Sequence, residues 1–308
     1  MNYADKLEDA ILNAISDDGE AILFSGGIDT TLIAVLAYKI RKLPLITVIF
    51  KETSPPDLKY SMLIAKHLGA EHHIKFFDIN EAVSAAKEVI KILKVFDPVE
   101  IRNSISIYIG LRFCKNLGYK CVLTGDGGDE LFAGYSFLYS KSREEVENWI
   151  KSVIRTWEFS SLKIGKYLKI LVKQPFTNHN VINIALKIPI SLKIARYRGR
   201  IYGKYILRKI LEKYVPYAVA WRNKDPIEFG SGSTHLRNIF SKWVSEDEYD
   251  AFSKEVKLRD KEQAFYYKLF KSLGYVIRPA KNPLKACKYC GSEVENKFCR
   301  ICGAYPAI

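Results

Sequence analysis

The sequence predicts a doubly wound α/β fold with a parallel sheet, followed by a mostly helical part and a small cysteine module. Three observations support this prediction. Apolar strand-like segments alternate with helical patterns over residues 1–135, as in a parallel sheet joined by crossover helices. Helical patterns dominate over residues 136–277, and we expect residues 1–277 to form one domain. A break at residues 278–286, interpreted as a linker, precedes a module at 287–308 that holds four of the six cysteines.

The elements of the first part follow from the spacing of apolar residues. Helices are expected where these residues recur at three- and four-residue spacing, over residues 5–15, 29–42, 56–68, 80–94 and 102–117. Strands are expected over the intervening segments 21–24, 45–50, 72–76 and 121–123. Gly69 and Gly118 follow two of the helices, and we expect them to end those helices.

Composition limits the class of protein. The chain has 308 residues, of which 48% are hydrophobic, so it can bury an ordinary core. No stretch of about 18 uncharged apolar residues occurs, so we expect no membrane-spanning helix and no membrane partner. The N-terminal residues carry regularly spaced charges, which suit an amphipathic helix and not a signal peptide. Cysteines gathered in one metal-like cluster are typical of the reducing cytoplasm, where we expect the protein to act.

Positive charge is concentrated in one segment. Residues 151–210 contain 14 Lys/Arg and one acidic residue, Glu158, in a chain whose net charge is +14. Two interpretations stay open. The segment is either an ordinary solvated basic face or a docking surface for an anionic partner such as RNA or an acidic protein.

The segment Ser25–Thr30 joins an expected strand to an expected helix and has the residues of a phosphate-binding loop. Its two glycines let the backbone turn sharply and bring N–H groups close to phosphate oxygens. Hydroxyl groups and a helix N-terminus add further donors. An aspartate in such a loop would repel phosphate unless it held a cation, so Asp29 indicates a Mg²⁺ ion that bridges the phosphates.

A second glycine-rich acidic motif, Thr124–Glu130, follows the strand expected at 121–123. Ligands of doubly wound folds bind outside the carboxyl ends of the strands, so both motifs should lie at the same edge of the sheet. Asp129 is the natural second carboxylate for the metal. Together the motifs predict an enzyme that cleaves ATP at the α-phosphate.

These residues resemble the synthetase domain of the asparagine synthetase family, within the ATP pyrophosphatases whose loop reads Ser-Gly-Gly-x-Asp-Ser. The resemblance covers residues 4–274. The segments that carry it, besides the first loop, are Ser54–Leu58, His67–His73, Arg102–Ser104, Thr124–Tyr135, Gln174–Phe176, Lys204–Arg208, Ala220–Lys224 and Lys261–Phe270.

The resemblance implies an adenine nucleotide α hydrolase-like fold and an AMP-forming ligase of asparagine biosynthesis. A carboxylate substrate would attack the α-phosphate of ATP, and a nitrogen nucleophile would then displace AMP. The resemblance further implies that Asp29 and Asp129 bind Mg²⁺. It implies that ATP and pyrophosphate are bound by Leu23, Ser25, Gly26, Gly27, Asp29, Thr30, Val48, Thr124 and Gly125.

Catalytic roles are implied for three further residues. Asp126 would lie close to the acyl intermediate, and Lys224 would stabilise charge at the α-phosphate. Arg102 would hold a substrate carboxylate or a phosphate. Without the resemblance, we would expect Lys224 to be a surface lysine in a basic segment, and Arg102 to form an ion pair with Glu100 at the start of a helix.

The chain also departs from the family. The ATP loop starts at residue 25, which leaves no room before it for a glutaminase domain. We therefore expect nitrogen from free ammonia, a separate glutaminase or an amine substrate. Thr30 replaces the usual serine, and Asn178 replaces an aspartate. Residues 225–232 differ from the segment typical of asparagine synthetases, so the carboxylate, small or carrier-bound, stays open. A second hypothesis is adenylation of a tRNA base.

The C-terminal cysteines form two Cys-x₂-Cys pairs separated by eight residues: Cys287, Cys290, Cys299 and Cys302. Two such pairs place four thiolates around one metal, and we predict a structural Zn²⁺ in a zinc ribbon, with iron in a rubredoxin-like site as the alternative. About 20 residues cannot build a core of their own, so metal binding supplies the folding energy. Cys114 and Cys121 are expected to be small core residues.

Overall fold

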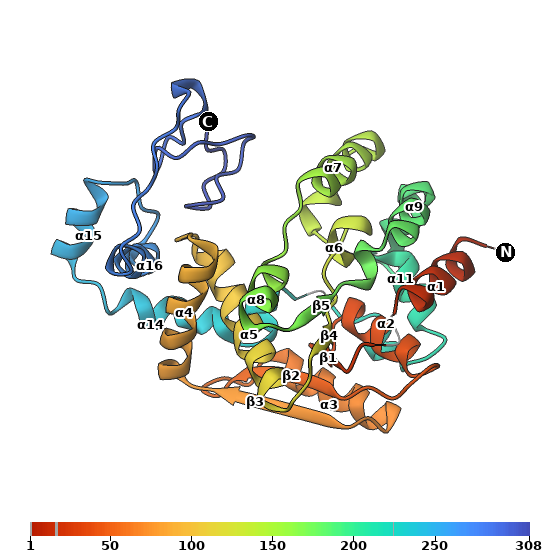
Figure 1. Ribbon diagram of the computed structural model, residues 1–308. Helices are drawn as coiled ribbons and strands as arrows, with labels where there is room; N and C mark the ends of the chain where they lie inside the picture. The colour runs from red at the N-terminus through yellow and green to blue at the C-terminus, as the bar shows by residue number, and fades with distance from the viewer. Residues whose placement is uncertain (1, 16–17, 224) are drawn as a thin grey trace. The chain divides into compact units, whose positions relative to one another are not determined.

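The computed structural model describes residues 2–15, 18–223 and 225–308 (Figure 1). These residues group into two compact units. Unit 1 comprises Met1–Val48, Pro56–Lys75 and Gly110–Pro226, and unit 2 comprises Ile49–Pro55, Phe76–Ile109 and Ile227–Ile308.

The predicted doubly wound α/β fold is confirmed. A five-stranded sheet has the order β3-β2-β1-β4-β5. Its strands are β1 (Ala21–Leu23), β2 (Leu45–Phe50), β3 (His72–Phe77), β4 (Cys121–Leu123) and β5 (Leu171–Lys173). β1 pairs in parallel with β2 and with β4, so that Ile22 lies opposite both Leu45 and Leu123. The chain runs outward from β1 to β3 and then returns to β4, which makes the β1–β4 boundary the topological switch point of the sheet.

The helices of the first part lie where they were expected, except that α2 ends at Ala37, five residues before the predicted end at residue 42. They are α1 (Tyr3–Ala14), α2 (Ile28–Ala37), α3 (Pro56–Leu68), α4 (Ile79–Leu93) and α5 (Pro98–Asn116). α5 begins at Pro98, four residues before the predicted start. Proline is favoured at the first position of a helix, because the N–H that it lacks would have no partner within the helix there. Asp78 caps the N-terminus of α4, because its side chain accepts a 3.0 Å hydrogen bond from the N–H of Glu81.

The rest of unit 1 is mostly helical, as expected, but it also contributes β5 and a hairpin. Its elements are α6 (Gly128–Leu131), α7 (Arg143–Thr156), α8 (Ser160–Leu168), α9 (His179–Lys187), α10 (Ile190–Lys193), β6 (Ala195–Tyr197), β7 (Arg200–Tyr202), α11 (Tyr205–Leu211) and α12 (Tyr217–Ala220), with short 3₁₀ turns at Ser136–Leu138 and Pro175–Thr177.

The core of unit 1 surrounds the central strands. Every residue of β2 is buried, as in a parallel strand that is covered on both faces. Leu7 and Ile11 of α1 are completely buried in the same cluster as α2 and α11. None of the described helices is long and apolar enough to cross a bilayer.

Unit 2 is built from helices and the cysteine module. Beside α4 and the first part of α5, its elements are α13 (Ile227–Gly230), α14 (Leu236–Ser241), α15 (Glu246–Ser253), α16 (Lys261–Ser272) and the 3₁₀ turns Ser233–His235 and Pro283–Lys285. Phe96 packs its ring against Tyr267 and Phe270 of α16, with ring centroids 5.0 and 5.5 Å apart.

The segment 278–286 differs from the expected linker. Pro279 and Ala286 form bridges with Ser292 and Glu293, and the N–H of Ala280 donates to the carbonyl of Gly291 at 2.9 Å. The module itself contacts the segment between α4 and α5, since the N–H of Phe96 donates to the carbonyl of Ile301 at 2.8 Å. A ribbon too small for its own core thus satisfies its backbone groups by pairing with the preceding segment and with unit 2.

Candidate functional site

The loops after β1 and β4 lie together in unit 1, at the switch point of the sheet. A side chain at Gly125 would lie 3.0 Å from Thr30 and 3.1 Å from Asp29. At Gly128, which begins α6, a Cβ atom would overlap the Asp29 carboxylate. The two motifs are therefore in direct contact, and glycine at these positions leaves the room that the Asp29 side chain occupies.

The loop Ser25–Thr30 is held by its own hydroxyl groups. The N–H of Gly27 donates to Ser25 Oγ at 3.1 Å, and the hydroxyls of Ser25 and Thr30 lie 3.2 Å apart. Gly26 has φ = +68°, and a Cβ atom there would lie 2.7 Å from the Ser61 nitrogen of α3. The positive φ and the close approach of α3 both require glycine. Thr30 keeps the hydroxyl that the usual serine would supply.

Lys204 joins the two carboxylates predicted to bind metal. Its ammonium contacts Asp29 and lies 2.8 Å from Asp129 Oδ1, and the lysine side chain is 3% exposed. Burial alone would lower the pKa of Lys204, but the charges of Asp129 and Asp29 outweigh it and hold the pKa above its ordinary value. The sequence places Lys204 in a segment that resembles the family, but it indicates no role for this residue.

The donor set fits a magnesium ion. Carboxylate oxygens from two loops converge, and hard oxygen ligands are those that Mg²⁺ prefers. Gly134 provides the second cradle of the site, because a Cβ atom there would overlap both the Asp129 carboxylate and the Lys204 side chain. Asp29 and Asp129 are therefore the residues that would hold this metal.

Asp126 is held in a hydrogen-bond network on the same loop. Its Oδ2 atom accepts hydrogen bonds from Thr124 at 2.7 Å, from Ser161 of α8 at 2.6 Å and from Gln174 at 2.9 Å. Gln174 also donates to Ser161 at 3.0 Å. Three donors fix the orientation of this carboxylate and connect the β4 loop to α8 and to the segment after β5.

Two of the residues implied to bind ATP, Leu23 and Val48, lie on neighbouring strands. Leu23 ends β1 and Val48 lies in β2, and both approach Gly110 of α5 so closely that a Cβ atom there would lie 2.5 and 2.9 Å from their side chains. Gly110 therefore brings the α5 backbone against these two apolar residues.

Arg222 connects the phosphate loop to the segment around residue 224. Its guanidinium is buried and donates to the carbonyl of Gly26 at 2.8 Å and to Asp225 at 2.9 Å. Asp57 lies 3.5 Å away, and burial raises the pKa of this carboxyl to about 7 against the opposing effect of Arg222. Lys224, the implied α-phosphate residue, lies outside the described residues.

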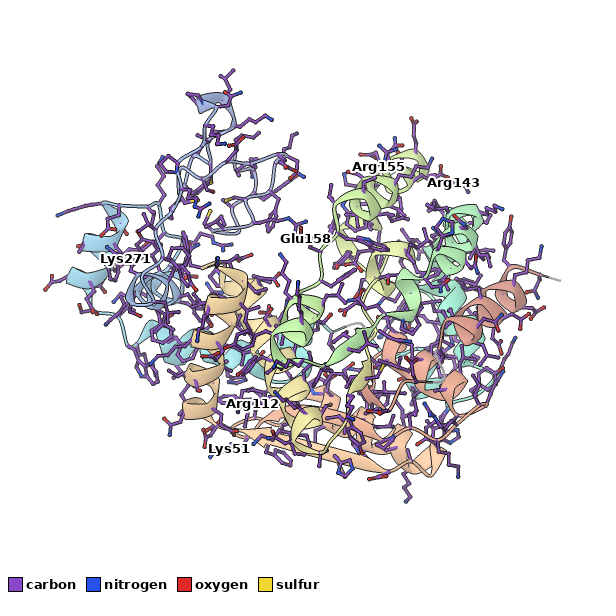
Figure 2. All side chains as sticks on the ribbon, in the orientation of Figure 1. Lys51, Arg112, Arg143, Arg155, Glu158 and Lys271 are labelled. Atoms are coloured by element: carbon purple, nitrogen blue, oxygen red, sulfur yellow. The ribbon has the colours of Figure 1, made fainter. Side chains whose placement is uncertain are left out.

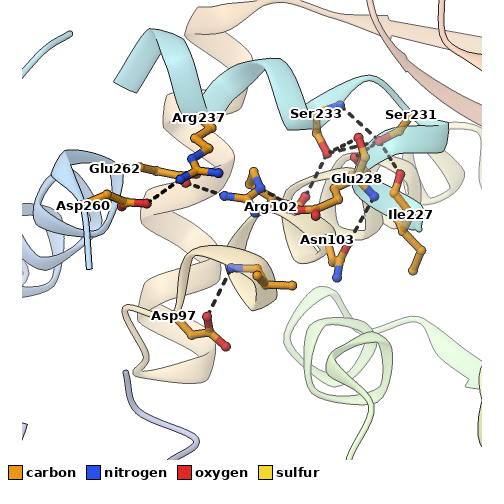
Figure 3. A network of polar contacts seen from close by, with 12 residues as sticks. Asp97, Arg102, Asn103, Ile227, Glu228, Ser231, Ser233, Arg237, Asp260 and Glu262 are labelled. Carbon is orange, nitrogen blue, oxygen red and sulfur yellow. Dashed lines mark hydrogen bonds and ion pairs between the residues drawn. The ribbon is translucent and has the colours of Figure 1, made fainter. Parts of the chain in front are cut away.

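Arg102 belongs to unit 2 and is engaged by two carboxylates there (Figure 3). Its Nε atom donates to Glu228 at 2.5 Å, and its Nη1 atom donates to Glu262 of α16. Glu100, the partner suggested by the sequence, accepts a hydrogen bond from Ser104 at 3.2 Å. Arg102 thus ties α5 to α13 and α16, and both of these contacts are to carboxylates of the protein itself.

Several cations of the basic stretch 151–210 are buried and cannot meet a partner. Lys193, Lys204 and Arg208 are 2% exposed and lie inside unit 1. Glu158 follows α7, beyond Arg155, and pairs with Lys163 at 2.6 Å (Figure 2). The number of cations that can meet a partner is therefore smaller than the sequence count suggests.

The four C-terminal cysteines meet as predicted. Their sulfur atoms all lie within 4.8 Å of one another, and Cys287–Cys302 and Cys290–Cys299 are 3.7 Å apart. Tetrahedral thiolates around one zinc ion at about 2.3 Å would be separated by about 3.8 Å, so the cluster fits a single ion. Gly291 and Gly303 have φ of +75° and +73°, the left-handed conformation that lets each knuckle turn.

The two remaining cysteines are core residues, as expected. Cys114 is completely buried and Cys121 is 5% exposed. Burial raises the pKa of the Cys114 thiol to about 12, which leaves it protonated and unreactive.

Comparisons with known proteins agree with the sequence resemblance. The family model described as asparagine synthase matches residues 2–171 and 163–271. Asparagine synthetase B [glutamine-hydrolyzing] of Escherichia coli is 27% identical over 266 residues, which cover 79% of this chain and 48% of that protein. Asparagine synthetase [glutamine-hydrolyzing] 2 of Oryza sativa is 30% identical over 254 residues, which cover 75% and 42%. The chain thus spans about half the length of the curated relatives it matches.

Among solved structures, the U34-tRNA thiolase NcsA from Methanococcus maripaludis aligns with 98% of this chain and 88% of its own, at 13% identity and a TM-score of 0.36. NMN synthetase from Francisella tularensis aligns with 76% and 93%, at 14% identity and a TM-score of 0.31.

Proposed function

The chain belongs to the asparagine synthase family, and on that premise we propose that it joins a carboxylate to ammonia or an amine in an ATP-dependent, AMP-forming reaction. The observation that carries the proposal is the convergence of Ser25–Thr30 and Thr124–Glu130 at the switch point, with Asp29 and Asp129 on one ammonium. Phosphoryl-transfer chemistry needs positioning and positive charge; the loops at this edge of the sheet offer positioning, and a Mg²⁺ ion held by the two carboxylates would supply the charge.

In the first step a carboxylate oxygen of the substrate bonds to the α-phosphorus, and pyrophosphate leaves with the electron pair of the broken P–O bond. In the second step nitrogen bonds to the acyl carbon, AMP leaves and the nitrogen loses a proton. The loop Ser25–Thr30 would bind pyrophosphate through backbone N–H groups. Mg²⁺ bound by Asp29 and Asp129 would supply positive charge to the phosphates. Asp126 orients the β4 loop, and Lys224 would stabilise the α-phosphate.

The acyl substrate is tested by ATP–pyrophosphate exchange with single carboxylates, aspartate first. AMP is the expected nucleotide product, and formation of ADP would refute the proposal. The nitrogen source is identified by adding ammonia, a separate glutaminase with glutamine, or an amine. Asparagine in the ammonia reaction identifies an asparagine synthetase. If exchange depends on a carboxylate other than aspartate, the AMP-forming reaction class is supported and aspartate is rejected as the substrate.

Asp129→Asn should lower exchange by about 100-fold or more, because it removes one carboxylate of the predicted metal pair. Asp9→Asn provides the matched control, since Asp9 is an exposed aspartate on α1 of the same unit. Circular dichroism of both variants establishes that the fold is kept. If the two variants catalyse exchange equally well, Asp129 does not bind the catalytic metal.

A second candidate function, adenylation of a tRNA base, is favoured by one surface of unit 1. The arginine hairpin, residues 195–202, carries exposed arginines at 196, 198 and 200. Beside it, the Arg198 guanidinium lies 4.5 Å from the centroid of the Tyr217 ring, which is 43% exposed. Tyr197 of the hairpin stacks on the buried Trp221, with ring centroids 4.0 Å apart, which anchors the hairpin. Arginines next to aromatic rings are common in surfaces that bind phosphates and stack on bases.

Replacing the three hairpin arginines by glutamine tests this candidate. Binding of total tRNA should weaken, and the slope of log affinity against log salt should fall by about three. A control replaces Lys6, Lys42 and Lys66, which are exposed on the same unit. If tRNA does not stimulate pyrophosphate release by the parent chain, the candidate is rejected. Equal effects of the two triple variants would indicate nonspecific attraction of a basic protein.

A further inference from the structure

Lys204 is built into unit 1 and is not a mobile surface lysine. Its backbone has φ = +53° at the start of α11, and its N–H donates to the carbonyl of Phe132 at 2.8 Å. The preceding Gly203 donates to the Tyr139 hydroxyl at 2.9 Å, and a Cβ atom there would overlap the carbonyl of Ala133. These contacts fix the point from which the Lys204 side chain reaches the two loops.

The charges at this point constrain what Lys204 can do. Burying an ammonium is costly unless opposite charges surround it, and Lys204 has two such partners. Conversely, Asp29 and Asp129 come from different loops and would repel each other when brought this close. The ammonium and the two carboxylates that it contacts together carry one net negative charge.

We propose that Lys204 is the positioning residue of the metal site and that it couples metal binding to nucleotide binding. The inference rests on the proposed function, because it takes Asp29 and Asp129 as the ligands of Mg²⁺. The ammonium keeps the two carboxylates together and shares them with the metal. The ammonium also repels a dication, so a metal ion should bind weakly when no nucleotide is present.

Nucleotide binding should strengthen the binding of the metal ion. A dication added to one net negative charge leaves the site positive, and the phosphate chain of ATP supplies the negative charge that offsets it. Metal and nucleotide therefore favour each other's binding, and the coupling is reciprocal. Without the ammonium, the two carboxylates alone match the charge of the dication, so the metal should bind before the nucleotide.

The test is titration with Mn²⁺, followed by electron paramagnetic resonance, with and without α,β-methylene-ATP. Lys204→Met and Lys204→Gln remove the charge, and the glutamine keeps hydrogen-bond donors. Lys193→Met is the control, because Lys193 is equally buried, at 2% exposure, and lies 6.0 Å above the Phe132 ring. Thermal unfolding in EDTA and in Mg²⁺ is measured on the same proteins.

In the parent chain and in Lys193→Met, the nucleotide analogue should tighten Mn²⁺ binding by about tenfold or more, because charges at these distances interact strongly in a partly buried site. Both Lys204 variants should bind Mn²⁺ at least about tenfold more tightly than the parent without the analogue, and lose most of the coupling. They should also melt lower in EDTA and gain more from Mg²⁺, since the metal then holds the carboxylates together.

Unchanged or weaker Mn²⁺ affinity in folded Lys204 variants would overturn the inference. The same conclusion follows if both variants stay unfolded in Mg²⁺, because the ammonium would then be needed for the fold alone. Variants that fold only when Mg²⁺ is added would support it. The titration involves no turnover, so a parent chain inactive in ATP–pyrophosphate exchange would refute the proposed function while the inference is judged separately.

Discussion

Replacement of Arg102 by methionine tests whether this residue supports the fold of unit 2 or binds substrate. The guanidinium is 7% exposed, and its partners Glu228 and Glu262 are 18% and 1% exposed. Methionine keeps much of the apolar volume but leaves two carboxylates without their cation. Removal of one partner of a buried ion pair costs about 3–5 kcal/mol, and we expect this loss in the free energy of unfolding at pH 8.

The loss in the free energy of unfolding should be smaller at acidic pH. Burial raises the pKa of Glu262, and Arg102 partly opposes that effect, so its removal should raise the pKa further. A carboxyl with a raised folded-state pKa contributes stability below its unfolded pKa of about 4.3 and loses it as the pH rises through the folded value. The variant should therefore be less destabilised at pH 5 than at pH 8. Urea unfolding followed by circular dichroism at both pH values measures this difference.

Two further variants make the test decisive. Adding Glu262→Gln to the Arg102 variant should recover stability at pH 8, because it removes the buried charge. Arg237→Met should cost less than about 1 kcal/mol, since Arg237 is 58% exposed and pairs with Asp260 at 3.1 Å. If Arg102→Met unfolds at the parent urea concentration but loses ATP–pyrophosphate exchange, Arg102 binds substrate and the structural argument is wrong.

Three other outcomes are expected. Metal removal from the ribbon by a strong chelator should lower the thermal midpoint, because the carbonyl of Cys302 accepts a 3.1 Å hydrogen bond from Arg259; metal content and scanning fluorimetry measure this effect. Gly128→Ala should weaken Mg²⁺-dependent exchange without loss of helix content, because a Cβ atom there overlaps the Asp29 carboxylate. Cys114 should resist iodoacetamide at pH 8 and react in urea, which mass spectrometry of the peptide detects.

The sequence was sufficient for the elements whose signals are local. The first four strands and the helices between them follow from apolar spacing, and the contact between the loops follows from the rule that parallel strands end at one edge. The sequence does not predict β5, because only one of the three residues Leu171–Lys173 is buried and the segment lies among lysines and helical patterns. The equally short β1 and β4 are apolar and mostly buried, whereas the position of β5 follows from its pairing with β4.

The partners of charged residues could not be derived in the same way. The sequence suggests an ion pair between Arg102 and Glu100, which is two positions away. The structure pairs Arg102 with Glu228 and Glu262, which lie 126 and 160 positions further along the chain. Lys204 lies 175 positions from Asp29 at the start of a short helix, where lysine is ordinarily exposed. Neither residue type nor spacing indicates such a pairing.

The contacts of the ribbon are likewise not determined by local sequence. Its cysteine spacing predicted the metal ligands, but the spacing does not determine what the ribbon contacts. Gly303 permits the second knuckle through its positive φ, and a Cβ atom there would also overlap the carboxylate of Asp97. Asp97 in turn accepts a 3.0 Å hydrogen bond from Arg259, which also donates to Cys302. One glycine thus serves both the metal knuckle and its docking, so metal binding should stabilise unit 2 and not the ribbon alone.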